Sequence, residues 1–173
     1  MSEKSIRDPG LVSFSERLAN SARFAGLFRE GMALVEETAA YLDGQGRTDA
    51  KALDRSASLA YATESMRLTT RLMQLASWLL LHRAVKEGEM SLQQANREKT
   101  KVKFSAPDPG PEDTVARLPE VLQNLIERSM TLQRQIRRLD ATIHAPVTEV
   151  TETRENAVNS QLGLLRAAFE RSA

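Results

Sequence analysis

Apolar residues recur at alternating spacings of three and four along three long stretches of the chain, residues 14–43, 55–87 and 118–144. In the first stretch the repeating positions are Leu18, Ser21, Ala25, Phe28, Met32, Val35, Ala39 and Leu42. In the third they are Leu118, Leu122, Leu125, Ser129, Leu132, Ile136, Leu139 and Ile143. A period of 3.5 residues is typical of long helices that pack side by side at a shallow angle. The pattern therefore predicts an all-α fold built on three long helices.

The middle stretch carries two apolar stripes instead of one. The first consists of Leu59, Ala62, Met66, Thr69, Met73, Ala76 and Leu80. The second lies on an adjacent face and consists of Leu68, Leu72, Leu75 and Leu79, together with Trp78. Large apolar side chains that remain exposed together mark an association site. We expect Met66, Met73 and Leu80 to face their own chain and the second stripe to form an interface with a second copy or another partner.

Self-association through a two-fold axis is the commonest way to cover such a stripe, because one patch then serves both copies. Full burial of each large apolar side chain contributes roughly 1.5–3 kcal/mol. The apolar pattern alone therefore predicts a homodimer.

The connection between the second and third long helices contains a short helix and a proline-rich linker. Ser91 and Gln94 have the spacing of a capping box, which predicts a short helix over residues 91–99. Residues 100–116 have no apolar periodicity, and their prolines exclude a helix and favour an extended chain. These prolines are Pro107, Pro109 and Pro111.

The two ends of the chain differ in composition from the middle. Residues 1–12 are polar and predict a flexible arm, whereas residues 145–173 predict a flexible tail. Apolar spacing within the tail is compatible with an amphipathic helix over residues 156–171, which is too short to be stable in water unless it docks. The tail residues that we expect to contact the bundle or a partner are Leu162, Leu164, Leu165 and Phe169.

The lengths of the predicted helices suggest how they pack. Thirty helical residues span roughly 45 Å, and three such helices predict an antiparallel bundle with up-down-up topology over residues 13–144. Gly26 and Gly31 both lie in the first helix, where glycine is unfavourable. We interpret both glycines as points where a neighbouring helix approaches closely.

Composition narrows the class of protein. The chain has 173 residues, which indicates one domain, and no cysteine, which excludes disulfides and thiolate metal sites and fits a cytoplasmic location. Lys and Arg number 24 against 23 Asp and Glu, a balance that argues against a dedicated nucleic-acid binder. The longest apolar run, residues 72–81, is about half the ~20 residues that a membrane span requires.

Candidate catalytic chemistry is sparse. The chain contains two histidines, His82 and His144, without the paired Glu-x-x-His motifs of a helical di-iron site. Neither a phosphate-binding glycine loop nor a cysteine nucleophile is present. We therefore expect no enzymatic activity, no cofactor and no bound metal.

Two sets of charged residues allow more than one interpretation. Glu64, Arg67 and Arg71 share a face of the second predicted helix, either as a solvent-exposed strip of ion pairs or as the polar edge of an interface. The third helix carries an arginine cluster, which is either a solvated face or a phosphate-contacting surface. The members of this cluster are Arg134, Arg137 and Arg138.

Three stretches closely resemble the RcdA family of alphaproteobacteria, which is also catalogued as a domain of unknown function. They are LFREGMALVEETAAYLDGQGR, LAYATESMRLTTRLMQLASWLLLHRAVKEGEM and LPEVLQNLIERS, beginning at Leu27, Leu59 and Leu118. The resemblance implies a dimeric three-helix bundle with a flexible C-terminal region and no enzymatic activity. It also implies an adaptor in cell-cycle proteolysis that helps to deliver substrates to the ClpXP protease, together with a cyclic-di-GMP-responsive co-adaptor.

The preferred hypothesis is accordingly a cytoplasmic, non-catalytic adaptor. Its implied partners are the ClpX unfoldase, co-adaptors and substrate transcription regulators, with neither nucleic acid nor membrane among them. The alternative is a helical DNA-binding protein, or another regulatory interaction module unrelated to proteolysis, and the arginine cluster of the third helix is its support.

Overall fold

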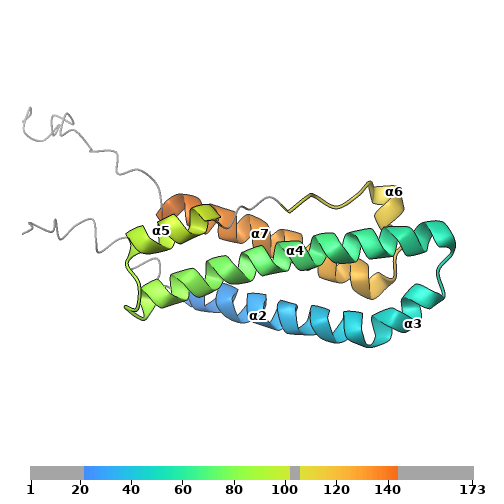
Figure 1. The fold of residues 1–173 in the computed structure, drawn as a ribbon, viewed down its shortest axis with the longest axis horizontal. Helices are drawn as coiled ribbons and strands as arrows, with labels where there is room; N and C mark the ends of the chain where they lie inside the picture. The colour runs from blue at the N-terminus through green and yellow to red at the C-terminus, as the bar shows by residue number, and fades with distance from the viewer. Residues whose placement is uncertain (1–21, 102–105, 144–173) are drawn as a thin grey trace, which may run out of the picture.

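The structure, a computed structural model, describes residues 22–101 and 106–143. Within these residues the fold is all helical, with no strand, and the expected all-α class is confirmed. The helices in Figure 1 are α2 (Ala22–Asp43), α3 (Gln45–Lys51), α4 (Arg55–Lys86), α5 (Leu92–Lys101), α6 (Glu112–Val115) and α7 (Glu120–Ile143). The arm predicted over residues 1–12 and the tail predicted over residues 145–173 lie outside the described residues.

The three long helices α2, α4 and α7 lie side by side, and each packs against the other two (Figure 1). Their inward faces supply a continuous apolar core. The largest fully buried apolar side chains are Phe24, Leu34, Leu68, Leu75, Trp78, Leu79, Leu122, Leu125, Leu132, Ile136 and Leu139. Burial of side chains of this size is the main favourable contribution to folding.

Helices α4 and α7 run in the same direction. Arg71 donates a hydrogen bond to Ser129, and Trp78 donates one to Asp140, so residue numbers rise together along the two helices. In Figure 1 both helices lead from the end that carries α6 to the end that carries α5. The expected up-down-up order is therefore wrong, since α7 repeats the direction of α4.

Helix α2 runs against both of the others. Glu37 in α2 pairs with Arg128 in α7, whereas Gly31, earlier in α2, lies against Leu132, later in α7. The topology is up-down-down.

The connection between α4 and α7 makes this order feasible. Ala106 bonds to Gln74, and Gly110 bonds to Glu64, so four extended steps of the linker pass ten residues of α4. Ten helical residues span about 15 Å, and four extended steps reach about 13 Å. The proline-rich linker is thus extended over residues 106–111 and leads back toward the start of α4. The prediction that residues 100–116 contain no helix is wrong at Glu112–Val115, which forms α6.

The segment between the first two long helices, residues 44–54, is mostly helical. Helix α3 occupies Gln45–Lys51, and its Asp49 accepts a 2.8 Å hydrogen bond from the Tyr41 hydroxyl. Gly46 faces the tyrosines, and a Cβ there would lie 2.5 Å from the Tyr61 hydroxyl oxygen. Any larger residue would clash with these tyrosines. Glycine at position 46 therefore gives α3 the space to fold back against the end of α2.

Side-chain caps mark the beginnings of two helices. Asp54 accepts a 2.9 Å hydrogen bond from the backbone N–H of Ala57 at the start of α4. Ser91 and Gln94 cap each other reciprocally at the start of α5, with distances of 2.9 and 3.1 Å. The capping box predicted from the sequence is therefore confirmed.

The two glycines of α2 have different surroundings. A Cβ at Gly31 would overlap the Leu79 Cδ1 atom and lie 3.4 Å from Cδ2 of Leu132, so three helices meet closely at this position. A Cβ at Gly26 would have nothing within 4 Å. The interpretation as a point of close approach is confirmed for Gly31 and wrong for Gly26.

Candidate interaction sites

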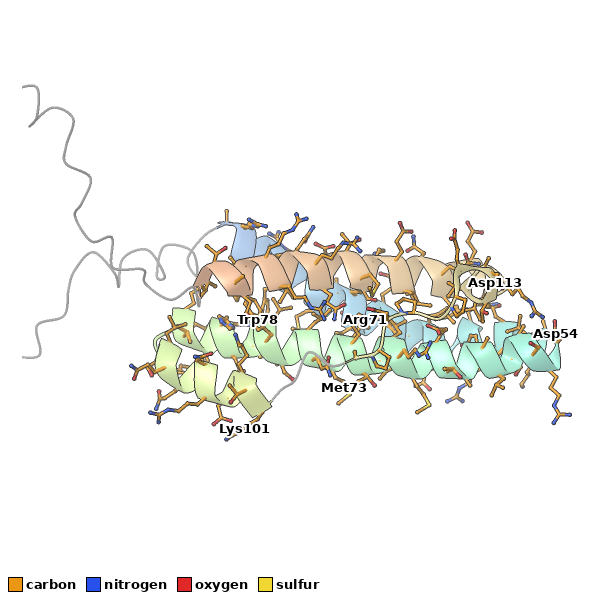
Figure 2. All side chains as sticks on the ribbon, turned by 90° about the horizontal axis from the view of Figure 1, so that it is seen from above. Asp54, Arg71, Met73, Trp78, Lys101 and Asp113 are labelled. Atoms are coloured by element: carbon orange, nitrogen blue, oxygen red, sulfur yellow. The ribbon has the colours of Figure 1, made fainter. Side chains whose placement is uncertain are left out.

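The outer face of α4 carries a row of exposed apolar side chains. Leu59, Met66, Met73 and Leu80 are 71%, 72%, 66% and 53% exposed, respectively. Successive members are seven residues apart, as at one position of a heptad repeat. Figure 2 shows Met73 projecting from α4 on the side away from α7. We name these four residues the outer stripe.

The structure reverses the assignment of the two apolar stripes of α4. The five residues expected to form an interface are buried in the core of their own chain, each at most 4% exposed, and they are Leu68, Leu72, Leu75, Trp78 and Leu79. Four leucines and a tryptophan offer more apolar area than a stripe diluted by alanine and threonine, so burying them in the core releases more free energy. The stripe expected to face the chain is instead the exposed one.

Three hydroxyl groups beside the outer stripe are already satisfied by their own helix. Three hydroxyls donate to the carbonyl four residues earlier, at 2.8–3.0 Å, and they belong to Thr63, Thr69 and Ser77. Small side chains at Ala62 and Ala76 separate the large ones. A partner helix could therefore approach this face closely without leaving these three donors unpaired.

The charged residues Glu64, Arg67 and Arg71 occupy a different face, which the proline-rich linker covers. Glu64 and Arg71 are 2% and 1% exposed, so these residues form neither a solvent strip nor an exposed interface edge. Arg67 donates a 2.7 Å hydrogen bond to Glu64 and keeps 31% of its side chain exposed. The burial of Glu64 and Arg71 could not be predicted from the sequence, because no sequence pattern indicates that the extended linker lies against this face of the helix.

Arg71 is the central residue of this buried cluster. Its guanidinium donates to the Ser129 hydroxyl and to the Pro107 carbonyl, both at 3.0 Å. Burial lowers the pKa of Arg71, while the carboxylates of Glu64 and Asp108 act in the opposite direction. Figure 2 shows Arg71 between α4 and α7, where its hydrogen bonds connect α4, α7 and the linker.

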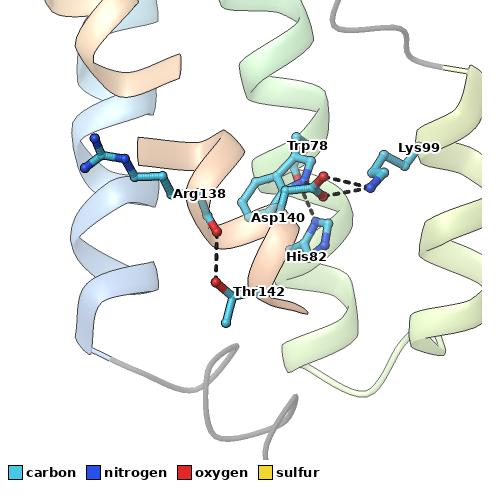
Figure 3. A network of polar contacts seen from close by, with 6 residues as sticks. All are labelled: Trp78, His82, Lys99, Arg138, Asp140 and Thr142. Carbon is cyan, nitrogen blue, oxygen red and sulfur yellow. Dashed lines mark hydrogen bonds and ion pairs between the residues drawn. The ribbon is translucent and has the colours of Figure 1, made fainter. Parts of the chain in front are cut away.

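A second polar network connects α4, α5 and α7 near the end of α4 (Figure 3). Asp140 accepts a 2.8 Å hydrogen bond from the Trp78 indole and forms a 2.8 Å ion pair with Lys99. The His82 ring is fully buried, stacks on Trp78 at 3.9 Å, and places Nδ1 2.9 Å from the Trp78 carbonyl oxygen. These contacts fix α5 to the other helices, and they give His82 a structural role.

The remaining candidate residues show no catalytic grouping. Arg134, Arg137 and Arg138 are exposed on α7. Among residues 22–101 and 106–143, no three metal-ligating side chains come together, and no helix has the length and apolarity needed to cross a bilayer. His144 and the tail residues Leu162, Leu164, Leu165 and Phe169 lie outside the part that the structure describes.

Comparisons with known proteins identify relatives over most of the chain. The family model described as "Protein of unknown function (DUF1465)" matches residues 15–169. The solved structure of RcdA from Caulobacter crescentus CB15 is 50% identical in sequence, with a TM-score of 0.63. The match covers 76% of this chain and 98% of RcdA. A comparison with curated proteins gave no match. The resemblance predicted from the sequence is thus confirmed.

Proposed function

Because the chain belongs to the RcdA family, which the DUF1465 model also describes, we propose that it is a non-catalytic adaptor in regulated proteolysis. Its role is to help deliver substrates, including transcription regulators of the cell cycle, to the ClpXP protease in the cytoplasm. The observation that carries this proposal is the 50% identity to RcdA over nearly the whole of that chain. The exposed outer stripe supports it, since a row of large apolar residues suits a protein partner.

The outer stripe is the surface on which we place the homodimer interface. A two-fold axis near Thr69 would bring Leu59 of one copy opposite Leu80 of the other, and Met66 opposite Met73. The heptad spacing, the small intervening residues and the satisfied hydroxyls favour helix-on-helix packing at this face. This assignment replaces the buried stripe that the sequence pattern suggested.

The proposed mechanism is tethering. A dimer presents two copies of every binding surface, and two weak contacts on one scaffold reinforce each other at an effective concentration on the order of millimolar. The tail residues Leu162, Leu164, Leu165 and Phe169 are our candidates for one of these contacts, because their spacing gives an apolar helical face. Partners in this scheme are the ClpX unfoldase, its co-adaptors and the substrates.

The test is recovery of purified ClpX, co-adaptors and candidate substrates on the immobilised protein. The full chain is compared with a chain that ends before Pro146 and with a chain carrying Leu165→Ser and Phe169→Ser. We expect the full chain to recover at least one of these partners and both altered chains to lose part of that recovery. Equal recovery by all three chains would remove the role of the tail, and recovery of none by the full chain would contradict the adaptor function.

A further inference from the structure

Residues 106–111, with the sequence APDPGP, form an extended strap across α4. Pro107, Asp108 and Pro111 are exposed, and of the strap's six residues only Ala106 is buried. The strap therefore contributes little apolar burial to the fold. A segment held by few apolar contacts opens at low free energy compared with core helices.

The strap is held mainly through its main chain. Glu64 Oε1 accepts from the Gly110 N–H at 3.0 Å, and Gln74 Oε1 accepts from the Ala106 N–H at 3.2 Å. Between them, Arg71 donates to the Pro107 carbonyl at 3.0 Å. The polar strip of α4, which we define as Glu64, Arg67, Arg71 and Gln74, thus recognises an extended peptide backbone in an acceptor–donor–acceptor order.

Two positions of the strap must be small. A Cβ at Gly110 would lie 3.0 Å from Glu64 Oε1 and 3.3 Å from the Arg67 guanidinium, so any larger residue there presses on the polar strip. Ala106 is 8% exposed, which leaves little room for a longer side chain. The prolines lack N–H groups and favour the extended conformation. The fitting sequence is small-Pro-x-x-Gly.

The polar strip retains hydrogen-bonding capacity that the strap does not use. Glu64 Oε2 and Arg71 Nε are buried and have no hydrogen-bond partner among the described residues. Buried polar groups are normally paired. One donor and one acceptor of the strip therefore remain for a ligand that offers more polar groups than the strap.

We propose that the polar strip of α4 is a peptide-binding site, that the strap is its intramolecular ligand, and that an extended small-Pro-x-x-Gly segment of a partner protein binds there in place of the strap. The strap is a tethered competitor of the partner segment. The apparent affinity of the site for that segment is therefore its intrinsic affinity multiplied by the fraction of time that the strap is detached. This site is separate from the outer stripe and does not depend on a role in proteolysis.

The experiment measures binding of a fluorescent peptide, APDPGPED, which copies residues 106–113, to the full chain by polarisation. Gly110→Val should push the strap off Glu64 while leaving the site intact. If the strap is open for about 1% of the time, the variant should bind roughly 100-fold more tightly than the wild type, and we expect at least a tenfold gain. Glu112→Gln, an exposed change two residues away, is the matched control and should give the wild-type affinity.

Two further arms make the result specific to the polar strip. Adding Gln74→Ala to Gly110→Val removes the acceptor for the first N–H and should weaken peptide binding. A peptide with valine in place of its glycine should not compete. The proposal is overturned if folded Gly110→Val binds the peptide no more tightly than the wild type does.

Hydrogen exchange of the wild-type chain gives a test that does not depend on the folding of a variant. The amides of Ala106 and Gly110 should exchange faster than those in the middle of α7, and faster still with excess peptide, because the peptide displaces the strap. Exchange of these two amides only at the rate of α7 would show that the strap leaves the helix only on global unfolding, and would also overturn the proposal.

Discussion

At the scale of single residues, Gly31 is a point where the long helices approach closely. The space that a Cβ would need there is filled by the end of Leu79, a fully buried side chain of the core. Gly26, five residues earlier on the same helix, has open space in that direction. Substitutions of these two glycines therefore allow the effect of helix propensity on stability to be distinguished from the effect of packing.

Gly31→Ala and Gly26→Ala should have opposite effects on stability. Alanine in place of a helical glycine stabilises by roughly 0.5–1 kcal/mol, and Gly26→Ala should show this gain alone. Gly31→Ala adds an overpacked contact, which costs about 1–3 kcal/mol, so the free energies of unfolding should differ by that amount. Urea unfolding of both variants measures the difference, and equal stability would show that Leu79 yields without cost.

Sequence patterns located the candidate interaction residues only in part, and the residues of α4 show why. Periodicity predicted two apolar faces on this helix, and both exist. It could not show which of the two faces is buried, because periodicity describes the spacing of apolar residues along a helix and not which face points toward the core. Met73 belongs to one apolar stripe and Leu75 to the other, yet Met73 is 66% exposed and Leu75 is 1% exposed. The choice depends on the total area that each face brings to the core.

At the scale of elements, the capping box of α5 was predictable because it is local, spanning only Ser91 to Gln94. The docking of α5 was not, since it depends on an ion pair between Lys99 and Asp140, which are 41 residues apart. Both side chains are largely buried, with 18% and 20% exposed, so this pair is less screened than the surface pairs of the chain. This long-range ion pair therefore helps to hold the charged end of a short helix whose Ala95 is also buried.

Lys99→Met should loosen α5 without unfolding the long helices. A hydrogen bond to a charged group contributes roughly 1.5–3 kcal/mol, and each 1.4 kcal/mol corresponds to about a tenfold change in an opening equilibrium. Amide exchange within α5 should therefore accelerate by roughly tenfold or more. Lys101→Met is the matched control, because Lys101 is 70% exposed and its ion pair among the described residues is with Glu98 of the same helix. Equal acceleration in both variants would mean that Lys99 does not anchor α5.

At the scale of the whole molecule, the parallel arrangement of α4 and α7 places the strap on one side of α4 and leaves another side open. An up-down-up order would have needed only a short turn between these helices, and no chain would then have crossed Arg71. The long connection both reverses the expected direction of α7 and covers the charged residues of α4. The outer stripe remains the large apolar surface of α4 that no described residue covers.

The outer stripe should determine the oligomeric state. The wild-type chain should have twice the 19.2 kDa chain mass in solution. Met73→Glu should give a folded monomer. Near the centre of a two-fold interface the new carboxylate would lie close to the same carboxylate of the other copy, and it would lose its water without gaining a partner of opposite charge. Val121→Glu places the same charge on α7, where Val121 is 46% exposed, and should leave the dimer intact.

Light scattering after gel filtration measures the mass, and the thermal midpoint of each variant shows whether the chain is folded. A Met73→Glu dimer as stable as the wild type would place the interface elsewhere. Dissociation by Val121→Glu as well would mean that α7, rather than the outer stripe, forms the contact. If Met73→Glu alone dissociates the dimer, the exposed stripe is the interface, and Leu68, Leu72, Leu75 and Leu79 serve only the core of each copy.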